Sequence, residues 1–307
     1  MMFSALLTSV LMLACAAPSL AQRNDFKERD ETNQTFQLSP GARVEISSIR
    51  GSVKIVNADT GTAEVRIIRT ARTRADLEYH KIEVTHTGNS LVVRGIQEPE
   101  ERRERNIQVD HQIILTLPRN IDLSVKSISG SLRAGDLDGP VTVNSISGSV
   151  IISNIAGKLE VNSVSGSVEL GTAGAEVRVN SVSGSVDVGN ARADVRVNSV
   201  SGNVGLGQVD GSLEVSSVSG GVKATLTSLS PQGIHIKSVS GSIEIGFKSE
   251  VNADFTAEHV SGQVYLDVPN VSRESEERSS NVRARIGAGG TPIKISSVSG
   301  NIRLTRS

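Results

Sequence analysis

The stretch that decides the fold is Leu159–Glu176, which reads LEVNSVSGS followed by VELGTAGAE. Each nine-residue block begins with two aliphatic residues that flank one polar residue, and this alternation is typical of a β-strand. The glycine near the end of the first block supplies the positive φ that a tight turn needs. Blocks of this kind follow one another without a gap from Leu123 to Gly221, and each pair of blocks forms one repeat unit.

A short motif marks the same repeat along the rest of the chain. Ser-Ile/Val-Ser-Gly begins once in every pair of blocks from Ser127 to Ser217, and related copies begin at Ser238, His259 and Ser297. A fixed internal period indicates a solenoid, in which each unit buries its apolar side against its neighbours. We therefore predict an all-β protein. Residues 123–307 should form a parallel β-solenoid with two nine-residue blocks per coil, preceded by a less regular β region over residues 44–122.

Equivalent positions in successive coils should stack into ladders of side chains. We expect two internal valine ladders, at the third and sixth block positions: Val161, Val179, Val197 and Val215, and Val164, Val182, Val200 and Val218. The second block position should face outward and carries Glu160, Arg178, Arg196 and Glu214. On this assignment Val182→Asp should be far more destabilising than Arg178→Ala, because it would bury an unpaired charge.

The end of the repeat predicts an exposed sheet edge, because the last strand of a solenoid has no next coil to pair with. Arg303 and Arg306 would place charges on that strand and discourage pairing with another chain. Deleting residues 302–307 should then increase self-association.

The first 21 residues have the pattern of a secretory signal peptide. An apolar run from Ala5 to Ala17 is too short to span a bilayer comfortably, and Ser19-Leu20-Ala21 is a small-x-small cleavage site. We expect cleavage after Ala21, a flexible leader over residues 22–43, and a protein exported to the periplasm or cell surface. The alternative is a lipoprotein held at the membrane through Cys15, the only cysteine.

The composition argues against several classes of ligand. The net charge is −1 and aromatic residues make up 2 % of the chain, so neither a basic surface nor stacking rings are available for nucleic acid. The five histidines lack metal-binding spacing, and the aspartates do not share one block position as the ligands of a calcium-binding β-roll would. We expect no metal and no cofactor.

No motif in the chain indicates catalysis. There is no G-x-S-x-G elbow, and no serine has an obvious paired base. Asp136 and Asp138 are the nearest candidates for the acidic groups of a polysaccharide-active β-helix enzyme, but they fit a loop equally well. We expect no catalytic residues and no enzymatic activity, and we keep such an enzyme as an alternative.

The candidate binding surface is a stripe of asparagines that occupy the same block position: Asn144, Asn162, Asn180 and Asn198. One interpretation is an amide ladder that stabilises the coil. The other is a polar stripe that binds a glycan or a protein partner. The charged loops at residues 98–105 and 272–278 are further candidates for a partner, although such loops are usually solvated.

The segment Leu115–Asn120 (LTLPRN), followed by repeated S-V-S-G-x-V units, resembles the bacterial β-strand-repeat family of unknown function that is labelled "putative adhesin". The resemblance covers roughly residues 36–307 and implies a β-solenoid outside the cytoplasm. Its main functional implication is a structural or adhesive scaffold that binds an envelope protein or a surface glycan. Because some members occur beside envelope-stress signalling systems, a periplasmic accessory of such signalling is an alternative.

Overall fold

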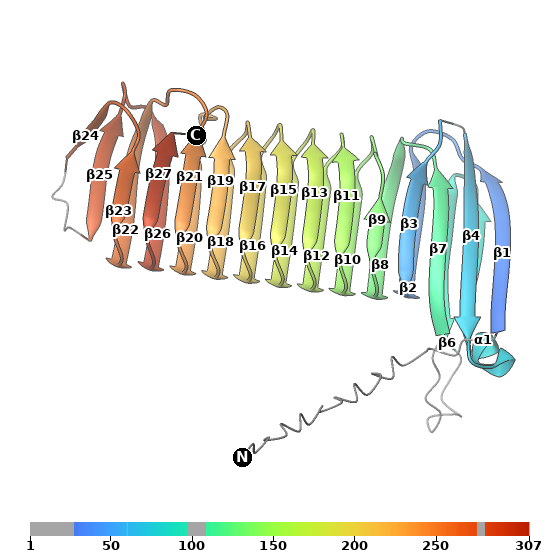
Figure 1. The fold of residues 1–307 in the computed structure, drawn as a ribbon. Coiled ribbons are helices and arrows are strands. Elements are labelled where there is room, and N and C mark those ends of the chain that lie inside the picture. The colour runs from blue at the N-terminus through green and yellow to red at the C-terminus, as the bar shows by residue number, and fades with distance from the viewer. Residues whose placement is uncertain (1–27, 60, 98–108, 275–279, 307) are drawn as a thin grey trace, which may run out of the picture.

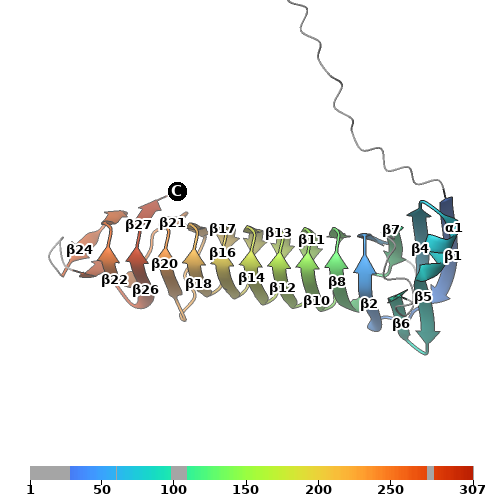
Figure 2. The same cartoon turned by 90° about the horizontal axis from the view of Figure 1, so that it is seen from below.

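The computed structural model describes residues 28–59, 61–97, 109–274 and 280–306 of the chain. Within these ranges, two long sheets face each other along a rod (Figures 1 and 2). The expected signal peptide, Cys15 and the loop at residues 98–105 lie outside the described residues.

The strands of the two sheets are as follows. Sheet A runs in the order β1 (Glu28–Gln37), β4 (Thr62–Ala71), β7 (Val109–Leu117), β3 (Ser52–Asn57), β9 (Leu132–Ala134), β11 (Val150–Ile155), β13 (Val168–Ala173), β15 (Val186–Ala191), β17 (Val204–Val209), β19 (Val222–Leu226), β21 (Ile243–Phe247), β27 (Ile302–Arg306) and β23 (Val264–Asp267). Sheet B runs in the order β24 (Val271–Arg273), β25 (Asn281–Ile286), β22 (Ala253–Ser261), β26 (Thr291–Ser299), β20 (Ile234–Ser240), β18 (Leu213–Ser219), β16 (Val195–Ser201), β14 (Val177–Ser183), β12 (Leu159–Ser165), β10 (Val141–Ser147), β8 (Ile121–Ser129), β2 (Ala42–Arg50), β6 (Ser90–Gln97) and β5 (His80–Thr87). A short helix, α1 (Arg74–Tyr79), lies between β4 and β5 in the chain.

Each coil consists of one strand of sheet B and the next strand of sheet A, as in β12 followed by β13. Neighbouring coils are parallel and in register, one repeat unit apart, so that Val179 pairs with Val161 on one side and Val197 on the other. The parallel β-solenoid predicted from the repeat is therefore confirmed. The longer spacing between β18 and β20 reflects a longer connection, residues 227–233, between β19 and β20.

The interior of the rod is a continuous column of aliphatic side chains between the sheets. The ladder at the third block position is confirmed, because Val161, Val179 and Val197 are each 0 % exposed. The ladder predicted at the sixth position is wrong: Val182 is 49 % exposed, whereas the preceding Ser181 is 3 % exposed. The alternation by twos simply continues through the motif, so serine points inward and valine points outward.

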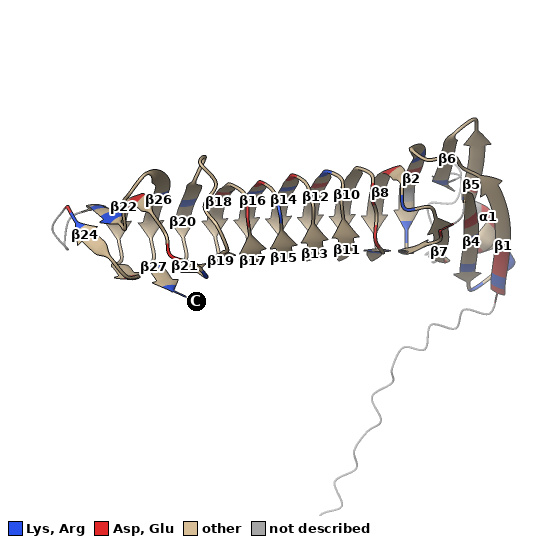
Figure 3. Ribbon diagram, turned by 90° about the horizontal axis from the view of Figure 1, so that it is seen from above, with Lys and Arg blue, Asp and Glu red and all other residues tan. Residues whose placement is uncertain are grey.

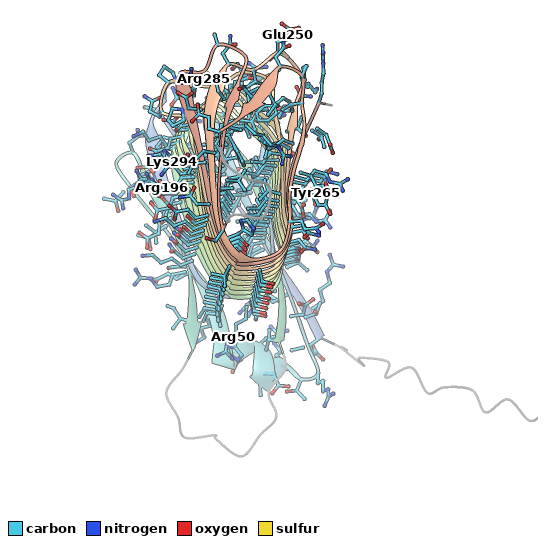
Figure 4. The ribbon with its side chains drawn as sticks, turned by 90° about the vertical axis from the view of Figure 1, so that its left-hand side faces the viewer. Arg50, Arg196, Glu250, Tyr265, Arg285 and Lys294 are labelled. Atoms are coloured by element: carbon cyan, nitrogen blue, oxygen red, sulfur yellow. The ribbon has the colours of Figure 1, made fainter. Side chains whose placement is uncertain are left out.

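The bend between the sheets explains this exchange of serine and valine. Figure 4 looks along the rod and shows the two sheets joined by a rounded corner. The inner side of a corner has less room than the flat part of the core, and a small serine side chain fits there without overpacking. The valines equivalent to Val182 consequently form an outer stripe along the rod.

The glycine that ends each motif lets the corners of successive coils approach closely. Gly166, Gly184, Gly202 and Gly220 all have positive φ, between 121° and 127°. A Cβ atom built on Gly220 would lie 2.2 Å from the carbonyl oxygen of Gly202 in the coil below. Because these contacts are with backbone atoms, neither partner can move aside without disturbing the ladder.

Gly220→Ala should lower the free energy of unfolding by about 3 kcal/mol or more, because this φ alone costs a non-glycine residue about 1–3 kcal/mol and the new Cβ meets backbone. Gly221→Ala is the matched control, since its nearest neighbour would lie at 3.5 Å and its φ is not positive. We expect the control to change stability by less than about 0.5 kcal/mol. Urea unfolding of both variants measures the difference, and equal losses would contradict the stacked-glycine explanation.

The flexible leader expected over residues 22–43 is wrong for its described part, because β1 covers Glu28–Gln37 and β2 begins at Ala42. β1 pairs antiparallel with β4 and forms the outer edge of sheet A. The strand has little apolar alternation. Its polar side chains are held by ion pairs with β4, including Arg66 to Glu31 at 2.7 Å and Arg69 to Asp30. β2 and β3 form the first complete coil, and β4–β7 fold over its outer side.

The C-terminal end of the chain does not lie at the end of the rod. β26 lies between β20 and β22, and β27 lies between β21 and β23. The last coil in sequence is thus the penultimate coil in space, and β25 and β24 cover β22 with antiparallel strands. The predicted edge-guarding role of Arg303 and Arg306 is wrong, because β27 is paired on both sides.

Candidate binding groove

The asparagine stripe forms a continuous chain of hydrogen bonds along sheet B. The side-chain amide of Asn162 donates to the Oδ1 atom of Asn144 at 3.0 Å, Asn180 donates to Asn162 at 2.7 Å, and Asn198 donates to Asn180 at 2.8 Å. The register of β10, β12, β14 and β16 makes this possible, because it places these residues directly above one another. The ladder interpretation is confirmed, and the amides also form one wall of a surface feature described next.

An apolar stripe runs parallel to the asparagines, two residues further along each strand. It consists of Ile128, Ile146, Val164, Val182, Val200, Val218, Val239, Val298 and Val260 in spatial order. Most of these side chains are about half exposed, and Val260 at the last coil is 79 % exposed. Contiguous exposed apolar side chains on the surface of a protein indicate an interaction surface more often than chance.

The two stripes border a groove of about 1330 Å³ that runs the length of the coils from β8 to β22. Asparagine side chains line one side, the valine and isoleucine side chains line the other, and the buried serine positions form its floor. The groove is mainly apolar and uncharged in its middle. Charged residues enter only toward its two ends, with Lys126 at one end and Lys237 and Glu258 at the other.

The outward second block positions lie outside the groove, where they form a ladder of mixed charge. Arg196 pairs with Glu214 of the next coil at 2.7 Å, as expected from their opposite charges. Arg178 instead pairs at 2.7 Å with Glu176, which lies two residues earlier in the chain, in the connection before β14. Figure 3 shows charges of both signs along the rod rather than one continuous patch. Exposed pairs of this kind contribute about 0–1 kcal/mol each, so this ladder tunes stability only slightly.

The other candidates from the sequence are dispersed in the structure. Asp136 accepts a hydrogen bond from the side chain of Asn154 at 2.7 Å and lies 3.8 Å from Arg119, which is a loop-stabilising arrangement. His235 is exposed, and His259 stands in register with Ser297 of the neighbouring coil. In the part of the chain that the structure describes, no three His, Cys, Asp or Glu side chains are grouped as a metal site would require.

Of the loop at residues 272–278, the structure describes only residues 272–274. Ser272 and Arg273 belong to β24 at the far end of the rod, and the Glu274 carboxylate lies 3.7 Å from Arg285. This part of the loop therefore forms an exposed ion pair in the C-terminal cap, defined as β22–β25, away from the middle of the groove.

The sequence reasoning missed a buried histidine in the N-terminal cap, defined as β4–β7, which cover the first coil. His111 is 5 % exposed, its Nδ1 atom lies 2.8 Å from the carbonyl oxygen of Arg50, and its ring stands edge-on to His80. Burial lowers the pKa of both imidazoles, so the cap favours their neutral forms. A signal was present, because His111 is in phase with the buried Ile113 and Leu115 of β7.

The fold and groove define the chain as a β-solenoid repeat protein with a lengthwise surface groove. Among the described residues, no helix is long and apolar enough to cross a membrane. Residues 42–305 match the family model described as Toastrack DUF4097. The chain therefore belongs to the Toastrack DUF4097 family, whose function is unknown, and the family resemblance inferred from LTLPRN and the serine–glycine repeats is confirmed.

One of the matching solved structures, with a TM-score of 0.50, supports the same fold, and two weaker matches are given beside it. A "putative adhesin" from Bacteroides fragilis is 17 % identical with a TM-score of 0.50, and the match covers 90 % of this chain and 97 % of that one. A "putative adhesin" from Parabacteroides merdae is 9 % identical with a TM-score of 0.33, over 89 % and 95 % of the two chains. A "putative lipid binding protein" from Parabacteroides distasonis is 13 % identical with a TM-score of 0.39, over 90 % and 96 %. No curated protein matches this chain.

Proposed function

We propose that this protein is a non-enzymatic, exported scaffold of the bacterial cell envelope that works through lateral contacts along its rod. The observation that carries the proposal is the lengthwise groove, in which the same apolar and amide groups recur at every coil. A repeated surface can hold an extended partner by many weak contacts that add together. Export to the periplasm or cell surface is part of the proposal and rests on the signal-peptide pattern of residues 1–21.

The neighbouring structures support this class of function without specifying a ligand. Those described as "putative adhesin" are consistent with a surface role. An accessory role in envelope-stress signalling rests on the family resemblance alone. A polysaccharide-active enzyme would need acidic groups gathered in a groove, whereas the middle of this groove is lined by amides and aliphatic side chains.

Site-specific photo-crosslinking in the producing cell tests the proposal. A photoreactive amino acid placed at Val182 lies in the groove, and the matched position Asn190 is exposed on sheet A, outside the groove. We expect a high-mass adduct in the envelope fraction from position 182, at least about tenfold stronger than from position 190, because only the groove should hold a partner closely.

Two results would contradict the proposal. Equal adducts at Val182 and Asn190, or none at either, would show that the groove does not make the contact. Turnover of an envelope polysaccharide by the purified protein, lost on changing one acidic residue such as Asp136, would show that the protein is an enzyme.

A further inference from the structure

We infer that the partner in the groove is a second copy of this chain, docked antiparallel so that the two apolar stripes pack against each other. The inference rests on the proposed function, because it assigns an occupant to the same groove. It makes the scaffold a pair of rods with a two-fold axis across their middle coils.

The first argument is the repeat distance. Parallel coils place equivalent side chains about 4.8 Å apart, and the nine groove-lining coils extend the pattern over about 38 Å. A partner can fill every position only if it repeats at the same distance. Figures 1 and 2 show the coils in a nearly straight row, so the stripe stays on one side of the rod. A second copy has the same pitch and straightness.

The second argument is shape. The apolar stripe is a row of valine and isoleucine side chains, one per coil, along one border of the groove. In an antiparallel two-fold arrangement the valine row of each copy lies against the valine row of the other, and the two asparagine rows face each other. A stripe about 38 Å long and about 10 Å wide on each copy corresponds to roughly 800 Å² buried in total, which is below the range of stable interfaces and is typical of a weak, transient one. We therefore expect a reversible dimer in the micromolar range.

The third argument is charge, and it selects the orientation. Lys126 lies at the first coil of the groove and Glu258 at the last. Full antiparallel overlap places Lys126 of each copy beside Glu258 of the other, which gives two favourable pairs by symmetry. Parallel overlap would place Lys126 beside Lys126, Lys237 beside Lys237 and Glu258 beside Glu258, which is repulsive at every charged position.

The antiparallel geometry also assigns each coil its opposite coil. The fifth of the nine coils, which carries Asn198 and Val200, lies on the two-fold axis and faces its own copy. The third coil, with Val164, faces the seventh, with Val239. These assignments distinguish the arrangement from a parallel one and from binding of an unrelated polymer.

Analytical ultracentrifugation of the purified full chain from about 1 to 200 µM tests for the dimer. Val200→Lys places two ammonium groups on the axis and should weaken dimerisation at least about tenfold. Asn190→Lys, on the opposite sheet, is the control and should dimerise like the wild type. Because Val200 is 49 % exposed, both variants should melt within a few degrees of the wild type, which separates loss of pairing from loss of folding.

Disulfide crosslinking in a Cys15→Ser background tests the orientation. Val200→Cys should form a covalent dimer readily, because the two sulfurs meet on the axis. Val164→Cys should not, since the two copies of that residue lie about four coils, or about 19 Å, apart, beyond the reach of a disulfide. An equimolar mixture of Val164→Cys and Val239→Cys chains should crosslink.

A charge exchange tests the end pairs. Lys126→Glu and Glu258→Lys should each weaken the dimer by about three- to tenfold, since each creates two like-charge contacts. The double variant should return to within about twofold of the wild type. Lys126 also lies 3.5 Å from Glu45 of its own chain, and recovery in the double variant would show that the lost affinity comes from the partner rather than from that pair.

The outcomes separate this inference from the proposed function. Equal crosslinking of Val164→Cys and Val200→Cys would overturn the antiparallel arrangement. A chain that stays monomeric at about 200 µM, while Val182 photo-crosslinks in cells to a different molecule, would overturn the second copy as occupant and leave the scaffold function standing. Absence of both the dimer and the cellular adduct would overturn both.

Discussion

Val179→Asp is expected to destabilise the rod by about 4–5 kcal/mol or more, whereas Val182→Asp should cost less than about 1 kcal/mol. The two residues are three positions apart on β14, but Val179 is 0 % exposed and Val182 is 49 % exposed. An aspartate at position 179 would lie between Val161 and Val197 in a column without a cationic partner. Removing the valine also forfeits about 1.5–3 kcal/mol of hydrophobic burial.

Chemical denaturation followed by circular dichroism measures both variants, with Arg178→Ala as a reference for a change on the outer surface. Because each coil contacts only its neighbours, the Val179→Asp defect should divide the rod into two segments that unfold separately. Hydrogen exchange should then be fastest in β12–β16. If Val182→Asp were as harmful as Val179→Asp, the assignment of inner and outer faces would be incorrect.

Removing residues 291–307 is expected to unfold the C-terminal cap. This segment forms β26 and β27, and it buries four large aliphatic side chains: Ile293, Ile295, Ile302 and Leu304. Their loss removes about 6–12 kcal/mol of favourable burial, and residues 253–290 lose the coil against which they pack. β20 and β21 become an open sheet edge, so the truncated protein should self-associate.

Limited proteolysis and light scattering measure this result. We expect cleavage within residues 248–290 at least about tenfold faster than in the full chain, because local unfolding exposes it, while the coils up to β18–β19 stay protected. Arg303→Gln with Arg306→Gln is the matched control, since it removes the charges and keeps the strand. If this double variant aggregated as strongly as the truncated chain, the edge-guarding explanation would regain support. A truncated chain as resistant as the full one would show that β22–β23 has moved up to pair with β20–β21.

The repeat made much of the fold predictable from the sequence. The length of the coil, the parallel register and the asparagine ladder follow from spacing alone, because each coil contacts only the coils next to it. The inward position of serine and the outward position of valine at the corner could also have been predicted from the sequence. Strict alternation from Val179 places Ser181 inside and Val182 outside, but the aliphatic character of Val182 favoured the wrong side.

The groove could be predicted only in part. The asparagine wall was identified from the recurrence of Asn144, Asn162, Asn180 and Asn198. Its apolar wall was missed because regularly spaced valines are usually assigned to the core when the direction of each side chain is not known. The groove lies between two columns of outward-facing side chains. It cannot be predicted when either column is assigned to the core.

The two ends of the rod depended on the tertiary structure. The motifs beginning at His259 and Ser297 are similar, so local pairing does not decide which coil lies beside β20–β21. The antiparallel β25 and β24 cover one side of β22, and this requires β22–β23 to be outermost and β26–β27 to enter between them and the rod. At the other end, β1 has no apolar pattern, and its ion pairs with Arg66 and Arg69 exist only once β4 is in register. The sequence by itself determined the repeating coil, because that coil is stabilised by contacts that recur with every repeat unit, whereas the caps depend on contacts between dissimilar segments that only the folded chain brings together.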